Sequence, residues 1–273
     1  MRALFIPKIP RMHSSFREQT VDGVTFLECT PLRDAGFVHA FSTRQSGESV
    51  EPFDSLDLQR PGAAPERRDE LERNTHRFLD AIGLANRGLA DAQQVHGKLV
   101  LQPSARGLCG PGDALVADSS GPAIGVRSAD CVTLLIGDPS TGRVAAIHAG
   151  WRGVVAGVVG ATIRAMAERG SQPRGLIAAV GPAISAARFE VGPEVVNAFV
   201  TADLGECAMP TAGAKAFADL ERAVCLQAAR EGIAGASIHA CGCCTAADPV
   251  RFFSHRRDAG LTGRMLSVIA PRS

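Results

Sequence analysis

The sequence predicts a single domain of the α/β class with mixed β-sheets. Three segments carry apolar residues at helical spacing, and eight short apolar or β-rich runs bounded by Gly, Pro, Asp and Ser are distributed around them. Because runs and helices alternate irregularly, mixed sheets are favoured over a repeating βαβ barrel. The chain shows no internal repeat and no low-complexity linker, so we expect one domain over residues 1–273, with an N-terminal extension over 1–20.

Each predicted helix has an apolar face and a glycine positioned to end it. In the third of these segments, Phe217 and Leu220 are expected to face inward from the same helix. The segments cover residues 65–86, 153–170 and 214–232, with end signals at Gly83, Gly170 and Gly232.

The short apolar runs are predicted to form buried strands. They cover residues 37–41, 99–102, 123–126, 132–136, 144–147, 176–180, 237–239 and 265–269.

The charge balance argues against several classes of partner. The chain has 29 basic and 28 acidic side chains, a formal net charge of +1, which gives no reason to expect nucleic acid or an anionic membrane as a partner. A small neutral or modestly anionic molecule fits better, and no obligate protein partner is evident. No apolar run reaches signal-peptide or membrane-span length, so a soluble cytoplasmic protein is expected. The eight cysteines are too irregularly spaced for a disulfide framework and are expected to be thiols or metal ligands.

The stretch AAIHAGWRGVV, residues 145–155, is predicted to be a strand, a turn and a helix. The strand covers 143–147, His148 stands at its carboxyl end, and 149–153 form the turn. In α/β proteins, ligands bind at the carboxyl ends of strands and at helix starts. A buried histidine with a tryptophan packed beside it is an equally good interpretation of this motif alone.

Two further motifs strengthen the functional interpretation. QQVHG places His96 before one predicted strand, and SADCVT places Cys131 between two others. Together with His148 they offer two imidazoles and one thiolate, a set that suits a catalytic zinc with an open fourth position. The spacings match no local zinc-finger pattern, so spacing alone leaves this trio open.

A second cluster of possible ligands lies near the end of the chain. The stretch HACGCCT brings His239, Cys241, Cys243 and Cys244 close together in sequence. Neighbouring side chains of an extended segment point to opposite faces, so only part of the cluster can address one ion. Both structural thiols and a second metal site remain open for this stretch.

Several polar residues beside glycines or in turns are candidates for binding and catalysis. Asp130, next to Cys131, is a candidate proton carrier or orienting group, although an aspartate in a turn often only caps its own backbone. Arginines near glycines are candidate clamps for phosphate or carboxylate, and each is also compatible with an ordinary surface role. They are Arg44, Arg152, Arg256, Arg257 and Arg264.

The ordered motifs FSTR, QVHG, SADC, IHAGWRG, VGPAIS, FEVG, CCT, FFSHRRD and TGRM resemble one family over about Phe37 to Ile269. Its members are variously called multicopper polyphenol oxidases (laccase-domain proteins), peptidoglycan editing factors, and purine nucleoside phosphorylases with adenosine deaminase activity. The resemblance implies a single domain of sandwiched mixed β-sheets flanked by helices, an α/β/β/α arrangement related to bacterial toxin domains with a Cys/His site. It also implies that His96, Cys131 and His148 are zinc ligands.

For activity, the resemblance implies zinc-dependent phosphorolysis of adenosine, inosine, guanosine and methylthioadenosine, and deamination of adenosine. Zinc lowers the pKa of bound water, and the hydroxide that forms is suited to attack the purine C6. Arg44 is the first choice for the phosphate contact, Arg152 and Arg256 are the next, and Asp130 is a candidate catalytic residue. The chain departs from the family at Asp57, where an asparagine is usual; a carboxylate lining the pocket would weaken phosphate binding.

Three other functions stay open. The first is a hydrolase that removes a wrong amino acid from a peptidoglycan precursor, with Cys131 as its nucleophile. A copper phenol oxidase is also compatible with two histidines and a cysteine, but the sequence has no His-x-His pair, so copper would be adventitious. A metal-stabilised binding module without catalytic activity is the third.

Overall fold

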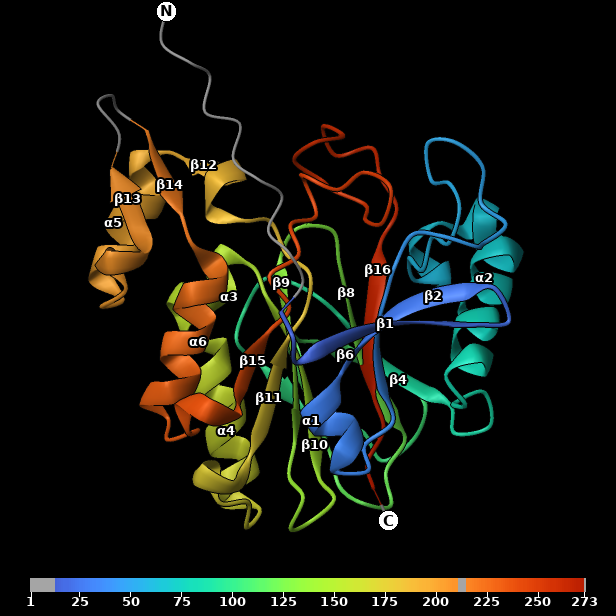
Figure 1. The fold of residues 1–273 in the computed structure, drawn as a ribbon, viewed down its shortest axis with the longest axis horizontal. Coiled ribbons are helices and arrows are strands. Elements are labelled where there is room, and N and C mark those ends of the chain that lie inside the picture. Colours follow the sequence, from blue (N-terminus) through green and yellow to red (C-terminus); the bar gives the residue numbers. More distant parts are fainter. Residues whose placement is uncertain (1–12, 211–214, 273) are drawn as a thin grey trace, which may run out of the picture.

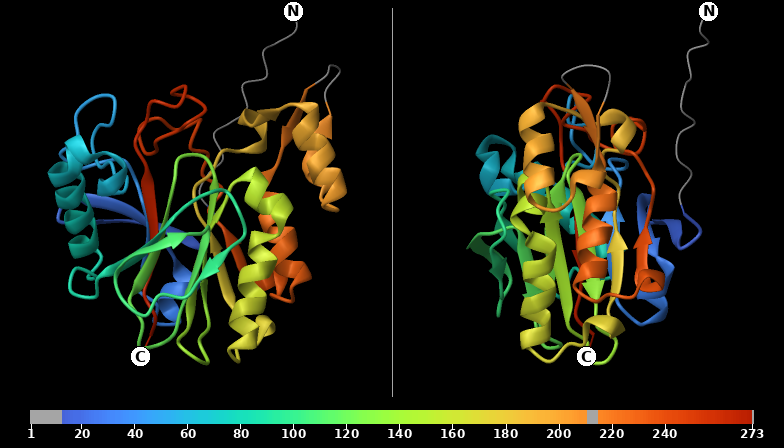
Figure 2. Two further views of the ribbon diagram at one scale, coloured as in Figure 1. Left: turned by 180° about the vertical axis from the view of Figure 1, so that it is seen from behind. Right: turned by 90° about the vertical axis from the view of Figure 1, so that its left-hand side faces the viewer.

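The computed structural model describes residues 13–210 and 215–272. Two β-sheets pack face to face, and helices cover the outer face of each (Figures 1 and 2). Residues of both sheets share one buried cluster, which includes Phe41 and Val126 from one sheet and Leu135 and Ala146 from the other. The α/β/β/α sandwich implied by the family resemblance is therefore confirmed.

The larger sheet has seven strands and includes both parallel and antiparallel pairs. In spatial order the strands are β1 (Phe16–Val21), β2 (Val24–Cys29), β3 (His39–Ser42), β16 (Met265–Ile269), β8 (Ala123–Ser128), β4 (Leu89–Gln93) and β6 (Gly107–Pro111). The outer face packs on α2 (Arg68–Ala81), which contributes Phe78 and Leu79 to a buried cluster with Val268. The expected N-terminal extension lies partly outside the described residues, and its end, from Phe16, forms β1.

The second sheet has six strands and is also mixed. Its order is β15 (Ile238–Ala240), β11 (Ile177–Val180), β9 (Val132–Gly137), β10 (Val144–Ala149), β7 (Ala114–Ala117) and β5 (Val100–Leu101). The helices α3 (Trp151–Ala156), α4 (Val158–Glu168) and α6 (Leu220–Arg230) lie against its outer face (Figure 1).

A small three-stranded sheet projects beside these helices, at the upper left of Figure 1. It has the order β12 (Glu190–Val191), β14 (Ala216–Ala218) and β13 (Ala208–Pro210), with α5 (Pro193–Thr201) packed on it. A short helix, α1 (Thr30–Asp34), follows β2. Single 3-10 turns occur at Pro61–Ala63, Pro65–Arg67, Pro173–Gly175, Ala186–Arg188, Gly205–Cys207 and Gly235–Ser237.

Each of the eight predicted strands corresponds to an observed strand, but two of the three predicted helices need correction. The predicted helix over 153–170 is two helices, because Gly157 adopts φ +84°, a left-handed conformation that ends α3 and precedes α4. The predicted helix over 214–232 begins only at Leu220, where the side chain of Asp219 caps the amide of Arg222. Phe217 therefore lies in β14, where it pairs with Glu190 and Met209.

The stretch around His148 also differs from its prediction in detail. Strand β10 continues through His148 to Ala149, and α3 already begins at Trp151, so Gly150 alone separates the two elements. The predicted turn over 149–153 was therefore too long. Within the described residues, no helix combines the length and the apolar character needed to cross a bilayer.

Candidate functional site

His96, Cys131 and His148 lie together at one end of the sandwich. One nitrogen of each ring and the Cys131 sulfur all lie within 4.8 Å of one another. The two rings are nearly perpendicular, with centroids 5.0 Å apart. His148 is buried, Cys131 is half-buried and His96 is exposed, so the group is open on the His96 side.

The topology explains this convergence. His96 follows β4 of the seven-stranded sheet, whereas His148 lies in β10 of the six-stranded sheet. Cys131 lies in the connection between β8 and β9, which crosses from one sheet to the other. The three side chains therefore meet at the edge where the two sheets face each other.

Asp113, which was not singled out in the sequence, holds both histidine segments. Its carboxylate is fully buried and accepts hydrogen bonds from Nδ1 of His148 at 2.8 Å and from the backbone amide of His96 at 2.9 Å. The amides of Val95 and Gly97 donate to its second oxygen. Burial tends to raise the pKa of this carboxyl, but these hydrogen bonds outweigh burial and lower it, so Asp113 is ionised.

The backbone at His96 adopts φ +59°. For a residue other than glycine, such a conformation costs about 1–3 kcal/mol and persists where the surroundings hold it. The three hydrogen bonds that Asp113 accepts from the backbone amides of Val95, His96 and Gly97 provide that support. The buried carboxylate of Asp113 thus fixes the position of His96, although the loop that carries His96 is exposed.

Cys131 and His148 favour opposite charges. Burial tends to raise the pKa of the Cys131 thiol, but the charge and hydrogen bond of His148, helped by His96, bring it down to about 6. Burial tends to lower the pKa of His148, but the Cys131 thiolate and Asp113 raise it to about 9. Near neutral pH, without a bound metal ion, the two side chains therefore form a thiolate–imidazolium pair.

The donor set fits a zinc ion. A thiolate and two imidazoles from three separate segments are the ligands of many catalytic zinc sites. Because Nδ1 of His148 donates to Asp113, its Nε2 is the nitrogen left for a metal. Gly150 makes room for the group, since a Cβ there would come within 2.9 Å of the His96 ring and 3.0 Å of the Cys131 sulfur.

The trio lines a cleft of about 600 Å³, a size typical of small-molecule sites. Apolar and aromatic side chains, among them Trp151, Ile184, Phe189 and Leu220, form part of its wall. The only acidic side chain that lines it, within the described residues, is Asp130. The cleft therefore combines an apolar surface with a metal-ligand set and an excess of positive charge.

Four of the other candidate site residues line the same cleft: Asp130, Arg152, Arg256 and Arg264. Asp130, at φ +98°, accepts from the hydroxyl of Thr245 at 2.5 Å and from the backbone amide of Arg256 at 2.6 Å, so both its oxygens are engaged. The Arg256 guanidinium lies 5.0 Å from the Phe189 ring centroid and donates to the backbone oxygen of Glu190. The Arg152 guanidinium lies 4.3 Å from the Trp151 ring centroid.

The structure does not bring Arg44 to this cleft. Its guanidinium donates to the backbone oxygens of Asp54 and Pro249 and pairs with the Asp54 carboxylate at 3.0 Å. It lines a separate shallow hollow, where it also stacks on Phe253. Arg257 is likewise engaged, since it pairs with Asp258 and donates to two backbone oxygens.

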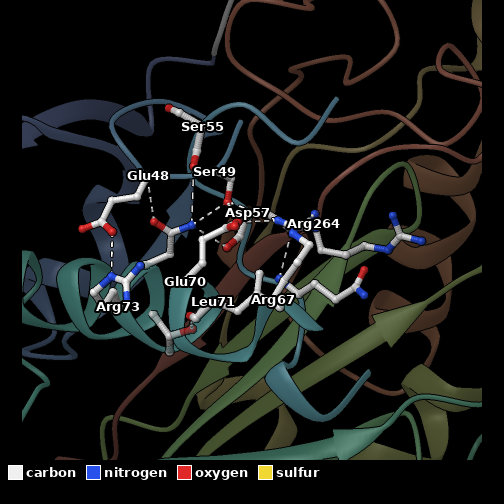
Figure 3. A network of polar contacts seen from close by, with 12 residues as sticks. Glu48, Ser49, Ser55, Asp57, Arg67, Glu70, Leu71, Arg73 and Arg264 are labelled. Atoms are coloured by element: carbon white, nitrogen blue, oxygen red, sulfur yellow. Dashed lines mark hydrogen bonds and ion pairs between the residues drawn. The ribbon is translucent and has the colours of Figure 1, made fainter. Parts of the chain in front are cut away.

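Asp57 does not line the cleft either. It is fully buried and its carboxylate pairs with Arg67 at 3.0 Å. Figure 3 shows this pair within a larger network of polar contacts. The expected weakening of phosphate binding by a pocket-lining charge therefore has no basis in the structure.

The cysteine cluster near the end of the chain forms no second group of three ligands. Among the described residues, the trio is the one set of three or more metal-ligating side chains found close together. Cys241, Cys243 and Cys244 are buried thiols, and the Cys244 sulfur accepts from the amide of Ser185. The structural interpretation of this cluster is favoured.

Comparison with known proteins gives consistent results. A family model described as multi-copper polyphenol oxidoreductase laccase matches residues 38–272. A purine nucleoside phosphorylase from Deinococcus radiodurans is 38% identical over 235 residues, which are 85% of this chain and 88% of the relative. The purine nucleoside phosphorylase YfiH of Escherichia coli is 36% identical over 240 residues, 86% of this chain and 93% of the relative.

Solved structures share the whole fold. YlmD from Geobacillus stearothermophilus superposes with a TM-score of 0.81 at 29% identity and covers 98% of this chain and 100% of its own. The Bacillus licheniformis hypothetical protein YfiH gives a TM-score of 0.84 at 24% identity, covering 95% and 100%, which supports the fold alone.

Proposed function

Because this chain belongs to the multi-copper polyphenol oxidoreductase laccase family, whose curated relatives are named purine nucleoside phosphorylases, we propose that it is a zinc-dependent enzyme acting on purine nucleosides. Its reactions would be phosphorolysis of adenosine, inosine, guanosine and methylthioadenosine, and deamination of adenosine. The observation that carries the proposal is a nucleoside-sized cleft in which His96, Cys131 and His148 meet beside arginines that have no acidic partner in the described part of the chain.

His96, Cys131 and His148 would hold the zinc ion. When bound there, zinc supplies Lewis acidity and acidifies water, which serves both proposed reactions. Copper is the weaker candidate because the chain lacks the paired histidines of multi-copper clusters.

The remaining cleft residues would bind and orient the substrates. Trp151 and Phe189 offer apolar surface for a purine ring. Arg152 and Arg256, each stacked on one of these aromatic rings, would hold phosphate close to the trio by charge-assisted hydrogen bonds. Asp130 accepts from the Arg256 amide and would position that arginine.

Chromatography of adenosine incubated with the protein tests this function. We expect adenine only when phosphate is present, and inosine with or without phosphate. Cys131→Ala should abolish both products and the bound zinc, whereas Cys109→Ala, which alters a half-buried thiol away from the cleft, should retain them. Conversion by Cys131→Ala at the full rate would exclude this site as the catalytic centre.

The thiolate–imidazolium pair supports a second candidate. Cys131 beside His148 has the charge state of a cysteine hydrolase nucleophile, which suits removal of an amino acid from a peptidoglycan precursor. A muropeptide precursor offered to the metal-depleted protein separates the two functions. Hydrolysis without metal would favour the second candidate.

A further inference from the structure

The cleft carries more uncompensated positive charge than the proposed reaction needs. Five arginines line it, and among the residues that the structure describes only Arg127 pairs with a carboxylate, that of Asp91. Within the described residues the other four have no acidic partner: Arg60, Arg152, Arg256 and Arg264. A nucleoside is neutral and inorganic phosphate carries at most two charges near neutral pH, so four unpaired guanidiniums point to a ligand with further negative charge.

These four arginines belong to two separately built groups. Arg152 and Arg256 lie near the trio. Arg152 is in the first turn of α3, which begins directly after Gly150, the residue that makes room for the trio. Arg256 donates its backbone amide to Asp130, which is next to Cys131 in the sequence. Arg60 and Arg264 lie on two segments that are joined elsewhere, by a hydrogen bond from the amide of Leu58 to the backbone oxygen of Arg264.

Asp57 braces this second group. One of its oxygens accepts from the amides of Arg264 at 2.8 Å and Gln59 at 3.0 Å, and the other pairs with Arg67. Figure 3 shows Asp57 between Arg67 and Arg264, within a network that extends to Ser49 and Glu70. A fully buried carboxylate, with hydrogen bonds to one oxygen and an ion pair at the other, therefore fixes the backbone that presents Arg60 and Arg264, and it does not itself line the cleft.

The guanidiniums of this second group are available to a ligand. Arg60 makes no side-chain hydrogen bond or ion pair within the described part of the chain, and Arg264 donates through one nitrogen to the backbone oxygens of Thr262 and Gly263. Guanidinium groups of this kind are suited to bidentate binding of a phosphate group.

We propose that Arg60 and Arg264 bind a phosphate group carried by the nucleoside, so that the cleft accepts purine nucleoside phosphates in addition to free nucleosides. This proposal rests on the proposed nucleoside function and names a further substrate class for the same site. The base and the ribose would lie along the apolar wall, with the phosphate of the nucleotide at the Arg60–Arg264 end.

Calorimetric titration with inosine and inosine 5′-monophosphate, in buffer without phosphate, tests this proposal. Inosine is the better probe because the proposed deamination cannot act on it. We expect the monophosphate to bind at least about tenfold more tightly than inosine, and Arg60→Gln and Arg264→Gln each to remove about tenfold of that affinity. Both variants should change inosine affinity less than twofold.

Arg174→Gln is the matched control, because it removes the same charge from an exposed arginine outside the cleft. Equal affinities for inosine and its monophosphate would overturn the proposal, as would an equal effect of Arg60→Gln and Arg174→Gln. A parallel titration with inorganic phosphate separates a second free-phosphate site from a nucleotide site. Two phosphates per chain, without tighter binding of the monophosphate, would also overturn it.

The outcome is independent of the test of the proposed function. Conversion of adenosine without any preference for the monophosphate would refute this inference and leave the nucleoside function intact. A monophosphate preference that depends on Arg60, without adenosine conversion, would refute the nucleoside chemistry and retain the anion site.

Discussion

Asp113 accepts a hydrogen bond from Nδ1 of His148 at 2.8 Å, and the same oxygen accepts from the backbone amide of His96. One buried carboxylate thus sets the ring orientation of one candidate ligand and the loop position of another. Carboxylates in this position typically alter metal affinity 10–100-fold when they are changed.

Asp113→Asn should therefore weaken zinc binding by about 10–100-fold, because the amide can donate as well as accept and no longer favours the same histidine tautomer. Zinc affinity is measured by competition with a chromophoric chelator. Asp138→Asn is the control, since Asp138 is also buried but accepts from Ser140 and Thr141 in a distant turn. Equal zinc affinity in both variants would contradict the role given to Asp113.

Gly150→Ala tests the space that the trio requires. The added Cβ would lie 2.9 Å from the His96 ring and 3.0 Å from the Cys131 sulfur, so one of these side chains must move. A displacement of this kind costs on the order of 100-fold where geometry is critical, and we expect a comparable loss of zinc affinity. Gly175→Ala, which meets no atom within 4 Å, should bind zinc normally.

Arg152 and Arg44 should respond differently to the same change. Arg152→Gln removes a cleft cation and should raise the KM for phosphate by about tenfold, with adenosine deamination little affected. Arg44→Gln breaks contacts with Asp54 and Pro249 outside the cleft, so it should lower the melting temperature and leave the KM for phosphate unchanged. Steady-state phosphorolysis rates and thermal melts distinguish the two, and a phosphate-specific defect in Arg44→Gln would restore the earlier expectation for that residue.

His39 should make stability depend on pH. It is buried, and burial lowers its pKa from 6.5 to about 4. Its Nε2 accepts from the amide of Cys29 at 2.8 Å and its Nδ1 lies 3.0 Å from the backbone oxygen of Phe37, an arrangement that requires the neutral ring. Between pH 6.5 and about 4, His39 binds a proton in the unfolded chain but not in the folded chain. Stability therefore falls as the pH drops from about 6.5 to 4.

The size of this effect is about 3 kcal/mol, at about 1.4 kcal/mol for each pKa unit. It is measured as the difference in unfolding free energy between wild type and His39→Gln, from urea titrations across pH 4–7. The difference isolates His39 from other titrating groups, such as Glu221. Burial raises the pKa of Glu221 to about 7, so Glu221 affects the pH dependence of stability in the opposite direction. A difference that does not vary with pH would show that His39 is protonated normally.

Much of the fold was predictable because buried strands are short, apolar and bounded by turn residues. The β1–β2 hairpin was missed although its signal is present: Asp22 and Gly23 form the two-residue connection between the paired residues Val21 and Val24, and an Asp-Gly pair is typical of such turns. Gly157 interrupts a segment whose apolar spacing remains helical on both sides, so periodicity alone does not reveal the break.

The site was predictable in its ligands but not in its supports. His96, Cys131 and His148 belong to residue types with evident chemistry, and the resemblance to a family brought them together. Asp113 lies in a Pro-Gly-Asp stretch typical of a loop, and its role depends on contacts with segments 16 and 35 residues away. Arg44 has the chemistry of an anion ligand, but the carboxylate of Asp54 already neutralises it.

The position of the trio has a further consequence for folding. His96 extends from one sheet, His148 belongs to the other, and Cys131 lies on the crossing between them. An ion held by all three would act as a cross-link through the sandwich, and unfolding would have to break it. Zinc supply and the stability of the fold would then be thermodynamically linked, so a shortage of zinc would lower the free energy of unfolding as well as the activity.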